Sequence, residues 1–316
     1  MHSINSRRFL IFSFGIFGFG ALVFQVVFAK NLMLLFGLTA PAVATVLAVY
    51  FSGLALGSLF FGRIADRFTS DNLLKIYAGL FVGIGVYGFL FPLIFKLLNL
   101  SVLAVNKIYP LNFSGFNFFA FLFAFIFLVF PAILIGAGFP LINKLLIRQE
   151  TEIGKKASLI YFIETFGSVL GAALAGFWLI PTFGNNATIF AAAGLILIVG
   201  VIFFLFSRNY DTSDKGEPWD DAQIRVRSGV HNPIFLYAFF ITGFLALALE
   251  VLYTKTLILF IGSSTYDFSL ILITFLLGIA LGSWALSFFA DHIKRGYSYF
   301  GMFLGLIGFW LFLTLI

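Results

Sequence analysis

An internal repeat is the feature that most constrains how this chain can fold. Residues 18–67 recur without a gap at residues 243–292, which lie 225 positions further along. Seventeen of the 50 aligned positions are identical, including four glycines, a lysine and an aspartate. Apolar composition pairs leucines by chance, but it does not keep glycines and charges in register. A repeat of this period in a strongly apolar chain indicates a membrane protein built from two parallel halves.

Composition supports the same class. Hydrophobic residues make up 61% of the 316 residues, charged residues make up 10%, and the mean hydropathy is +1.09. Several windows exceed the 18 or so apolar residues that a helix needs to cross a bilayer, and none shows the alternation of a membrane strand. We therefore predict an all-α polytopic membrane protein. The chain has no cysteine, which excludes disulfides and thiolate metal sites.

Nine apolar segments are long enough to be membrane spans. The first resembles a signal peptide, because Arg7 and Arg8 precede an apolar run, but its repeat at residue 243 is an ordinary span. We therefore take it as the first helix. The expected spans are 9–30, 41–62, 73–95, 116–139, 157–180, 187–207, 234–257, 267–289 and 297–316.

The loop charges predict the orientation of these spans. Lysines and arginines gather in alternate loops, at 7–8, 63–75, 144–156, 225–227 and 294–295. The opposite loops near Pro41, Asn185 and Ser263 carry none, and the opposite loop at 96–115 carries only Lys96 and Lys107. By the positive-inside rule, the N-terminus is cytoplasmic and the protein is a multi-pass protein of the cell (inner) membrane. The net charge of +6 follows this pattern and does not indicate nucleic-acid binding.

The spans divide into two halves. Residues 1–207 hold six spans, residues 208–233 form a polar cytoplasmic linker, and residues 234–316 hold three spans that begin the repeat. Two six-helix halves are the plan of major-facilitator transporters, so we predict a major-facilitator-like fold with an incomplete second half. Three further spans are expected after Ile316, so we take the chain as a fragment or a truncated reading frame; the alternative is a natural nine-span protein.

Residues 62–67, at the end of the second span, resemble the loop signature between the second and third helices of major-facilitator transporters. Its glycines permit close helix approach, and its aspartate can bridge to arginines on a neighbouring helix. Two interpretations stay open: a gating latch between the halves, or a static helix cap with positive-inside anchors. The residues, with their repeat partners, are Gly53, Gly57, Gly62, Arg63, Asp66, Arg67, Gly278, Gly282 and Asp291.

Polar residues inside the spans are the candidate ligand-binding residues. Glu250 lies well inside the seventh span, and its repeat partner is Gln25. A carboxylate at that depth is costly unless it is paired, protonated or facing a water-filled cavity. Glu164, in the fifth span, either extends toward the lysines at 155–156 or lines a central cavity.

Lys30 and its repeat partner Lys255 are the candidate members of an ion pair. One interpretation is that both extend to the outer interface. The other pairs Glu250 with Lys30 across the pseudo-twofold axis.

No catalytic apparatus is visible. The three histidines, at 2, 231 and 292, are scattered and form no metal-binding set, and no phosphate-binding loop follows a strand. We expect neither a metal nor a cofactor within these residues.

Several motifs resemble the membrane part of spermidine synthase-like proteins, also described as fused major-facilitator/spermidine synthase proteins. The resemblance covers nearly the whole chain, and its motifs are residues 20–30, 52–58, 130–140 and 161–181. The first helix of that family usually carries Tyr-Glu-x-x-Trp-x-Arg. Here Phe24, Gln25, Phe28 and Lys30 occupy those places, and Glu164 stands where the family commonly has Asn.

The resemblance implies a membrane module that binds or moves a polyamine or another small cation. Our hypothesis from the residues themselves is that Gln25, Glu164 and Glu250 serve such a ligand, because a desolvated amine needs a compensating acceptor. The aminopropyltransferase-like domain of the family is missing here, and it is a possible downstream or separate partner. Three alternatives stay open: an independent major-facilitator-type transporter of an unrelated solute, a non-transporting anchor for an aminopropyltransferase- or methyltransferase-like domain, and a membrane-bound enzyme whose catalytic domain lies beyond Ile316.

Overall fold

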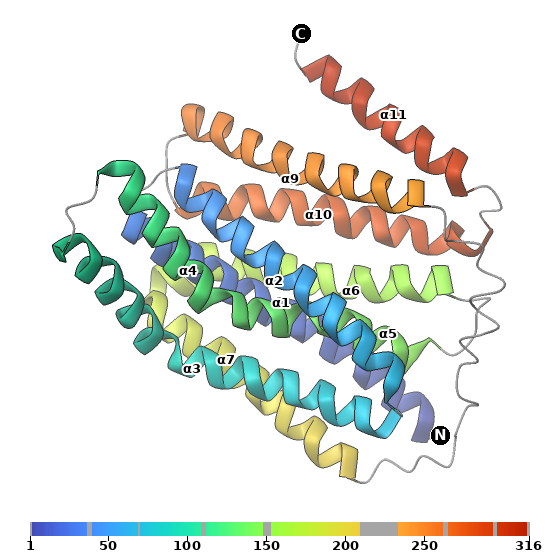
Figure 1. Ribbon diagram of the computed structural model, residues 1–316. Helices are drawn as coiled ribbons and strands as arrows, with labels where there is room; N and C mark the ends of the chain where they lie inside the picture. Colours follow the sequence, from blue (N-terminus) through green and yellow to red (C-terminus); the bar gives the residue numbers. More distant parts are fainter. Residues whose placement is uncertain are drawn as a thin grey trace.

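Every regular element that the computed structural model describes is a helix (Figure 1). The structure describes residues 2–36, 40–68, 70–108, 112–147, 153–208, 233–261, 265–292 and 296–314. The predicted linker therefore lies almost entirely outside the described residues. The helices are α1 (His2–Phe36), α2 (Ala40–Arg67), α3 (Ser70–Ile108), α4 (Phe113–Gly136), α5 (Gly138–Leu146), α6 (Ile153–Leu174), the π-helical turn η2 (Ala175–Leu179), α7 (Ile180–Arg208), α9 (Pro233–Ile261), α10 (Thr265–Phe289), the 3₁₀ turn η3 (Ala290–His292) and α11 (Gly296–Thr314).

Seven helical runs are long and apolar enough to cross a membrane, which agrees with an all-α polytopic membrane protein. One of them covers the predicted spans 157–180 and 187–207 together, as a run of 53 residues. A straight helix of that length would extend about 80 Å, more than twice the hydrocarbon thickness. The last predicted span appears as a shorter apolar helix, Ser298–Leu313.

Gly184 is the point at which the long run changes direction. Its backbone dihedrals are φ 78° and ψ 174°, and no other described residue has a positive φ. Side chains with a Cβ rarely adopt these angles, so glycine permits the reversal there. In Figure 1, α6 and α7 are accordingly separate helices that run in opposite directions.

Four helix pairs account for most of the packing. Within residues 1–208, α1 packs on α6, α2 on α4, and α3 on α7, and α10 packs on another side of α6. By contrast, α9 and α11 touch few other helices, and most of their large side chains are exposed. Helix α6 is therefore the element that joins the two sequence repeats.

Aromatic side chains fill the interface between α1, α3 and α7. Phe17, Tyr77, Phe81 and Phe203 are each at most 1% exposed, and the Phe17 and Phe81 ring centroids are 4.9 Å apart. Tyr77 meets both Phe81 and Phe203 edge to face. Such pairs contribute about 0.5–1.5 kcal/mol each beyond the area they bury. The abundant phenylalanines thus include a packed core as well as outward-facing side chains.

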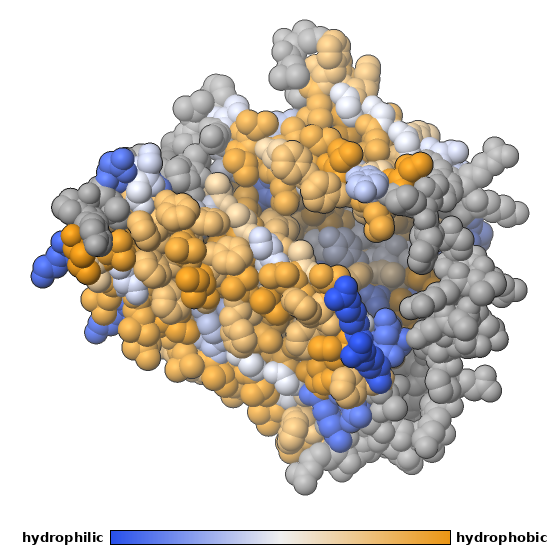
Figure 2. Space-filling model, in the orientation of Figure 1, coloured by the Kyte–Doolittle hydropathy of each residue, from blue (hydrophilic) through white to orange (hydrophobic). Residues whose placement is uncertain are grey.

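The outer surface is mainly apolar, as expected for contact with lipid. Exposed leucines, phenylalanines and isoleucines occur on every long helix. Figure 2 shows a continuous apolar face, with hydrophilic side chains toward the ends of the bundle. Surface of this kind over entire helices indicates a lipid bilayer environment.

Candidate functional site

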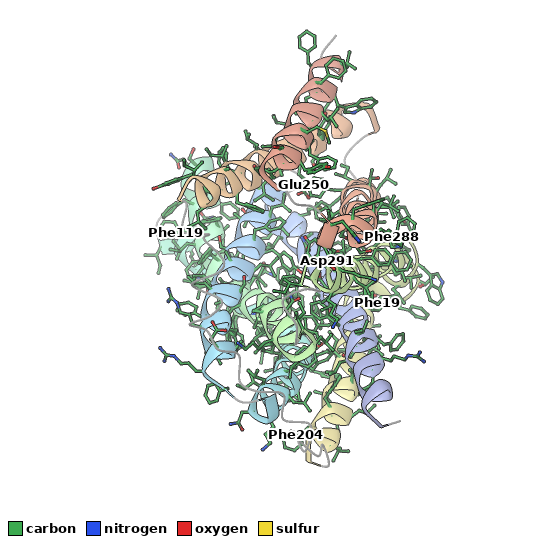
Figure 3. All side chains as sticks on the ribbon, turned by 90° about the vertical axis from the view of Figure 1, so that its right-hand side faces the viewer. Phe19, Phe119, Phe204, Glu250, Phe288 and Asp291 are labelled. Atoms are coloured by element: carbon green, nitrogen blue, oxygen red, sulfur yellow. The ribbon has the colours of Figure 1, made fainter. Side chains whose placement is uncertain are left out.

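Glu250 is a buried carboxylate on a helix that is otherwise largely exposed. Its residue exposure is 4%, and Oε2 has no hydrogen-bond partner among the described residues. One turn further, the Thr254 hydroxyl donates 2.7 Å to the Glu250 carbonyl oxygen and is itself buried. This bond satisfies the threonine and leaves the carboxylate available to a ligand. Figure 3 labels Glu250, viewed along the bundle.

Gln25, the repeat partner of Glu250, is also buried, with an exposure of 2%. It lies in the middle of α1, where residues 20–29 are all buried. The two repeat copies therefore place an amide in one half and an acid in the other, both inside the protein. Lys30 is half-buried one turn beyond Gln25, whereas the side chain of Lys255 lies outside the described residues.

The hypothesis that Lys30 pairs with Glu250 is not reflected in this structure. Neither side chain forms an ion pair or hydrogen bond with the other, although both are described. The half-buried position of Lys30, near the end of α1, is compatible with an amine that extends toward the interface.

Glu164 is half-buried on α6, and it has three tyrosines as electrostatic neighbours. Tyr50 comes from α2, Tyr77 from α3 and Tyr161 from α6 itself, and the carboxylate is close enough to act on each hydroxyl. The Tyr77 hydroxyl also lies 3.5 Å from the Ser13 hydroxyl of α1. A carboxylate within a span can accept hydrogen bonds from an ammonium group.

Sequence analysis missed these tyrosines, because they come from three helices and share no local motif. A tyrosine inside an apolar span needs a polar neighbour for its hydroxyl, and that requirement was the available signal. That requirement does not identify which residue the polar neighbour is.

The two repeat-related aspartates have different partners. Asp66, at the end of α2, forms an ion pair with Lys144 of α5, with 3.2 Å between Oδ1 and Nζ. Asp291, in η3, accepts a hydrogen bond of 3.1 Å from the backbone N–H of Lys155. That bond caps the N-terminus of α6, where a negative charge is favoured.

The Asp291 bond joins the second half of the chain to the first, whereas the Asp66 ion pair stays within the first half. Gly154 permits the approach, since a Cβ there would lie 2.8 Å from Asp291 Oδ1. Asp291 therefore caps a helix of the other half, and whether this contact also acts as a gating latch stays a prediction. Arg63 and Arg67 are exposed beside Asp66.

The glycines of the predicted packing motif fall into two groups. A Cβ on Gly53 would lie 2.2 Å from Ala132 Cβ, and one on Gly57 would lie 2.1 Å from the Ile133 carbonyl oxygen, so both glycines permit contact with α4. Gly62 is different, since its nearest neighbour would be Pro140 Cβ at 4.0 Å. Gly278 and Gly282 meet no described atom within 4 Å.

Comparison of the chain with protein-family models, curated proteins and solved structures gives no match. The described residues also contain no group of three His, Asp or Glu side chains that could hold a metal ion. A functional assignment must therefore come from the geometry of the buried polar residues.

Proposed function

We propose that this chain is a major-facilitator-like membrane module that binds a small organic cation and moves it across the membrane. The observation that carries this proposal is Glu250, a carboxylate 4% exposed whose Oε2 has no partner among the described residues. A buried charge of this kind is retained at a cost, and an ammonium group in contact with it would offset that cost.

The helix pairing supports the major-facilitator part of the proposal. In that fold each six-helix half consists of two inverted three-helix repeats. If α4 and α5 count as one crossing, the second three are α4, α6 and α7. In this inverted repeat α1 corresponds to α4, α2 to α6 and α3 to α7. The α1–α6 pair then corresponds to the α2–α4 pair, and the α3–α7 pair corresponds to itself. The dominant contacts thus have the expected internal symmetry.

The number of crossings in the proposal is nine. The 53-residue run supplies two because it reverses at Gly184, and Ser298–Leu313 supplies the last. Basic residues support a cytoplasmic N-terminus in the inner membrane, because seven of them lie at helix ends that up-and-down topology brings to one side. These are Arg8, Arg63, Arg67, Lys75, Lys144, Lys155 and Lys156.

The ligand in this proposal is an amine that carries several positive charges, such as a polyamine. Glu250 and Glu164 offer two carboxylates within the spans, and Gln25 adds an amide. The resemblance to spermidine synthase-like membrane domains points to the same ligand class. In this proposal catalysis belongs to a separate aminopropyltransferase-like partner.

Uptake of radiolabelled spermidine by proteoliposomes tests the proposal. We expect saturable uptake that falls at least tenfold in Glu250→Gln, which keeps the side-chain shape and removes the charge. Lys75→Gln is the control, since that side chain is an exposed charge at the basic end of the bundle and belongs to no candidate site, and its uptake should be unchanged.

Unchanged uptake in Glu250→Gln would contradict the role of this residue. Absence of any spermidine uptake or binding, together with normal folding of Glu250→Leu and Glu164→Leu, would instead favour a non-transporting membrane anchor.

A further inference from the structure

A tyrosine of α3 forms a hydrogen bond with the backbone of α4 beside a proline. Pro131 lies inside α4 and has no backbone N–H, so the carbonyl oxygen of Phe127, four residues earlier, lacks its helical donor. The Tyr87 hydroxyl donates to this oxygen, with 2.6 Å between the two oxygen atoms. A side chain of α3 therefore replaces the backbone donor that the proline removes from α4.

Packing fixes the direction of this hydroxyl. Tyr87 is 8% exposed, and its ring centroid lies 6.3 Å from that of Phe28 on α1 and 6.3 Å from that of Phe130 on α4. Inside a span neither the hydroxyl nor the carbonyl has water as a ready alternative, so loss of the bond would leave both groups unpaired. The bond is therefore a specific link between α3 and α4.

A second proline lies close to this bond, in α3. Pro92 is inside that helix, five residues after Tyr87, and it likewise removes the helical donor to the carbonyl oxygen of Gly88. The parts of α3 and α4 between the two prolines, residues 93–108 and 112–127, form the arms of a hairpin (Figure 1). We call it the proline-bounded hairpin. Helices bend most sharply at proline, so each arm has a point of bending at its base.

The tyrosine bond crosses the base of this hairpin. Tyr87 precedes the first proline and lies outside the hairpin, whereas Phe127 lies within it. The part of α4 after the second proline is held by α2 instead, because a Cβ on Gly136 would lie 2.4 Å from the Leu54 carbonyl oxygen. A bend at the prolines would thus move the hairpin and break the tyrosine bond, while this contact with α2 stays in place.

We propose that the proline-bounded hairpin is a hinged unit, and that the Tyr87 hydroxyl is the strap that holds it in the conformation seen here. A side-chain hydrogen bond can be released without unfolding either helix. The hinge also lies beside a candidate ligand residue, since a Cβ on Gly88 would be 2.7 Å from the Phe24 ring, and Phe24 precedes Gln25. A change in the angle of the hairpin would therefore alter the packing next to Gln25, whichever ligand that amide serves.

Distances between two spin labels test the hinge. Because the chain has no cysteine, Leu34→Cys near the end of α1 and Leu103→Cys on the hairpin accept the labels, and both leucines are exposed. We expect one narrow distance distribution with Tyr87 present, and a distribution at least twice as wide, or a second distance, in Tyr87→Phe. Adding Pro131→Ala should restore the narrow distribution, because the N–H of residue 131 can then bond to the Phe127 oxygen.

The control pair of labels uses Ile198→Cys in place of Leu103→Cys. Ile198 is exposed on α7, which lies outside the hairpin, so this distribution should not change in Tyr87→Phe. An unchanged Leu34–Leu103 distribution in Tyr87→Phe would overturn the proposal. Equal widening of the control distribution would also overturn it, because the variant would then have lost its packing in general.

Thermal unfolding of the same variants in detergent measures the link between the tyrosine and the proline. Tyr87→Phe should lower the unfolding temperature, and the loss should be less than half as large when Pro131→Ala is present. Tyr77→Phe is the matched control, because Tyr77 is also buried on α3 but its hydroxyl lies 3.5 Å from that of Ser13 on α1. Its effect should be the same with and without Pro131→Ala. Equal losses for Tyr87→Phe in both backgrounds would contradict the strap.

Discussion

Gln25 and Glu250 show how one repeat position can carry two chemistries. Both are almost completely buried, at 2% and 4%, so burial alone does not distinguish them. An amide can remain neutral inside the protein, whereas a carboxylate needs a proton, a counter-ion or a ligand. At this repeat position the electrostatic cost of burial therefore falls on the second half.

The two aspartates give a prediction about stability at the residue scale. Asp291→Ala removes the oxygen that caps α6, and loss of a cap typically costs about 1 kcal/mol. Asp66→Ala removes an exposed ion pair, which contributes about 0–1 kcal/mol. We expect Asp291→Ala to lower the thermal unfolding temperature in detergent more than Asp66→Ala does.

Asp291→Asn is the control for that comparison, because its side-chain oxygen can still accept a hydrogen bond from the Lys155 N–H. Its unfolding temperature should be closer to that of the unmodified protein than the unfolding temperature of Asp291→Ala is. Equal effects of Asp66→Ala and Asp291→Ala would contradict the capping role.

At the scale of elements, small residues determine how closely helices approach. Gly18 on α1 lies against α6, where a Cβ would be 2.2 Å from the Glu164 carbonyl oxygen, and Gly167 and Gly171 lie equally close to the α1 backbone. Gly243 is the repeat partner of Gly18, and a Cβ there would have no described atom within 4 Å. One repeated glycine is thus a contact in the first half and an open position in the second.

This difference makes a matched pair of substitutions informative. Gly18→Ala should destabilise the protein by about 3 kcal/mol, at the upper end for overpacking, because the clash is with backbone that cannot rotate away. Gly243→Ala should leave stability unchanged or slightly raised, since alanine favours helix over glycine. Thermal unfolding in detergent measures both. A larger loss in Gly243→Ala than in Gly18→Ala would contradict the observed packing.

Gly184 is a second element-scale test, for a different physical reason. No described atom lies within 4 Å of a Cβ at this position, so the cost of Gly184→Ala comes from its positive φ alone. Backbone strain of that kind is worth about 1–3 kcal/mol. We expect Gly184→Ala to lower the unfolding temperature and Gly194→Ala not to lower it. Gly194 lies in the regular part of α7, and a Cβ there would have its nearest neighbour at 4.0 Å.

The sequence predicted elements better than it predicted partners. Apolar length and the repeat located the helices, and the predicted close packing at Gly53 and Gly57 is seen against α4. The same motif did not reveal that Gly62, Gly278 and Gly282 would have no close neighbour. A glycine permits another helix to approach closely, but it does not determine which helix does so. Likewise Glu164 was recognisable from its depth, whereas Tyr50 and Tyr77 near it required the tertiary structure.

At the scale of the whole molecule, α6 lies between the two repeats. It packs on α1 at one face and on α10 at another. The contact continues beyond both helices, where Gly154 of α6 meets Ala290 of η3 and Gly176 of η2 meets Ser269 of α10. In a transporter of two halves, relative motion must change this α6–α10 contact. The Asp291 cap is positioned where such motion would break or form a hydrogen bond.

The orientation of the whole molecule gives the last prediction. Arg67, exposed at the basic end of the bundle, and Ser114, exposed near the opposite end, suit single-cysteine labelling in this cysteine-free chain. With intact cells and a membrane-impermeant maleimide, we expect Ser114→Cys to be labelled and Arg67→Cys to react after lysis. The reverse pattern would contradict the cytoplasmic N-terminus inferred from the basic residues.

The reversal at Gly184 also has a consequence for how the chain enters the membrane. Between Glu164 and Arg208 the chain has no charged residue, and the turn offers few polar side chains, among them Thr182 and Asn185. Transferring a turn of this kind across hydrocarbon costs far less than transferring a charged loop. Helices α6 and α7 can therefore cross the membrane as one unit, before α6 packs on α1 and α10 and α7 packs on α3.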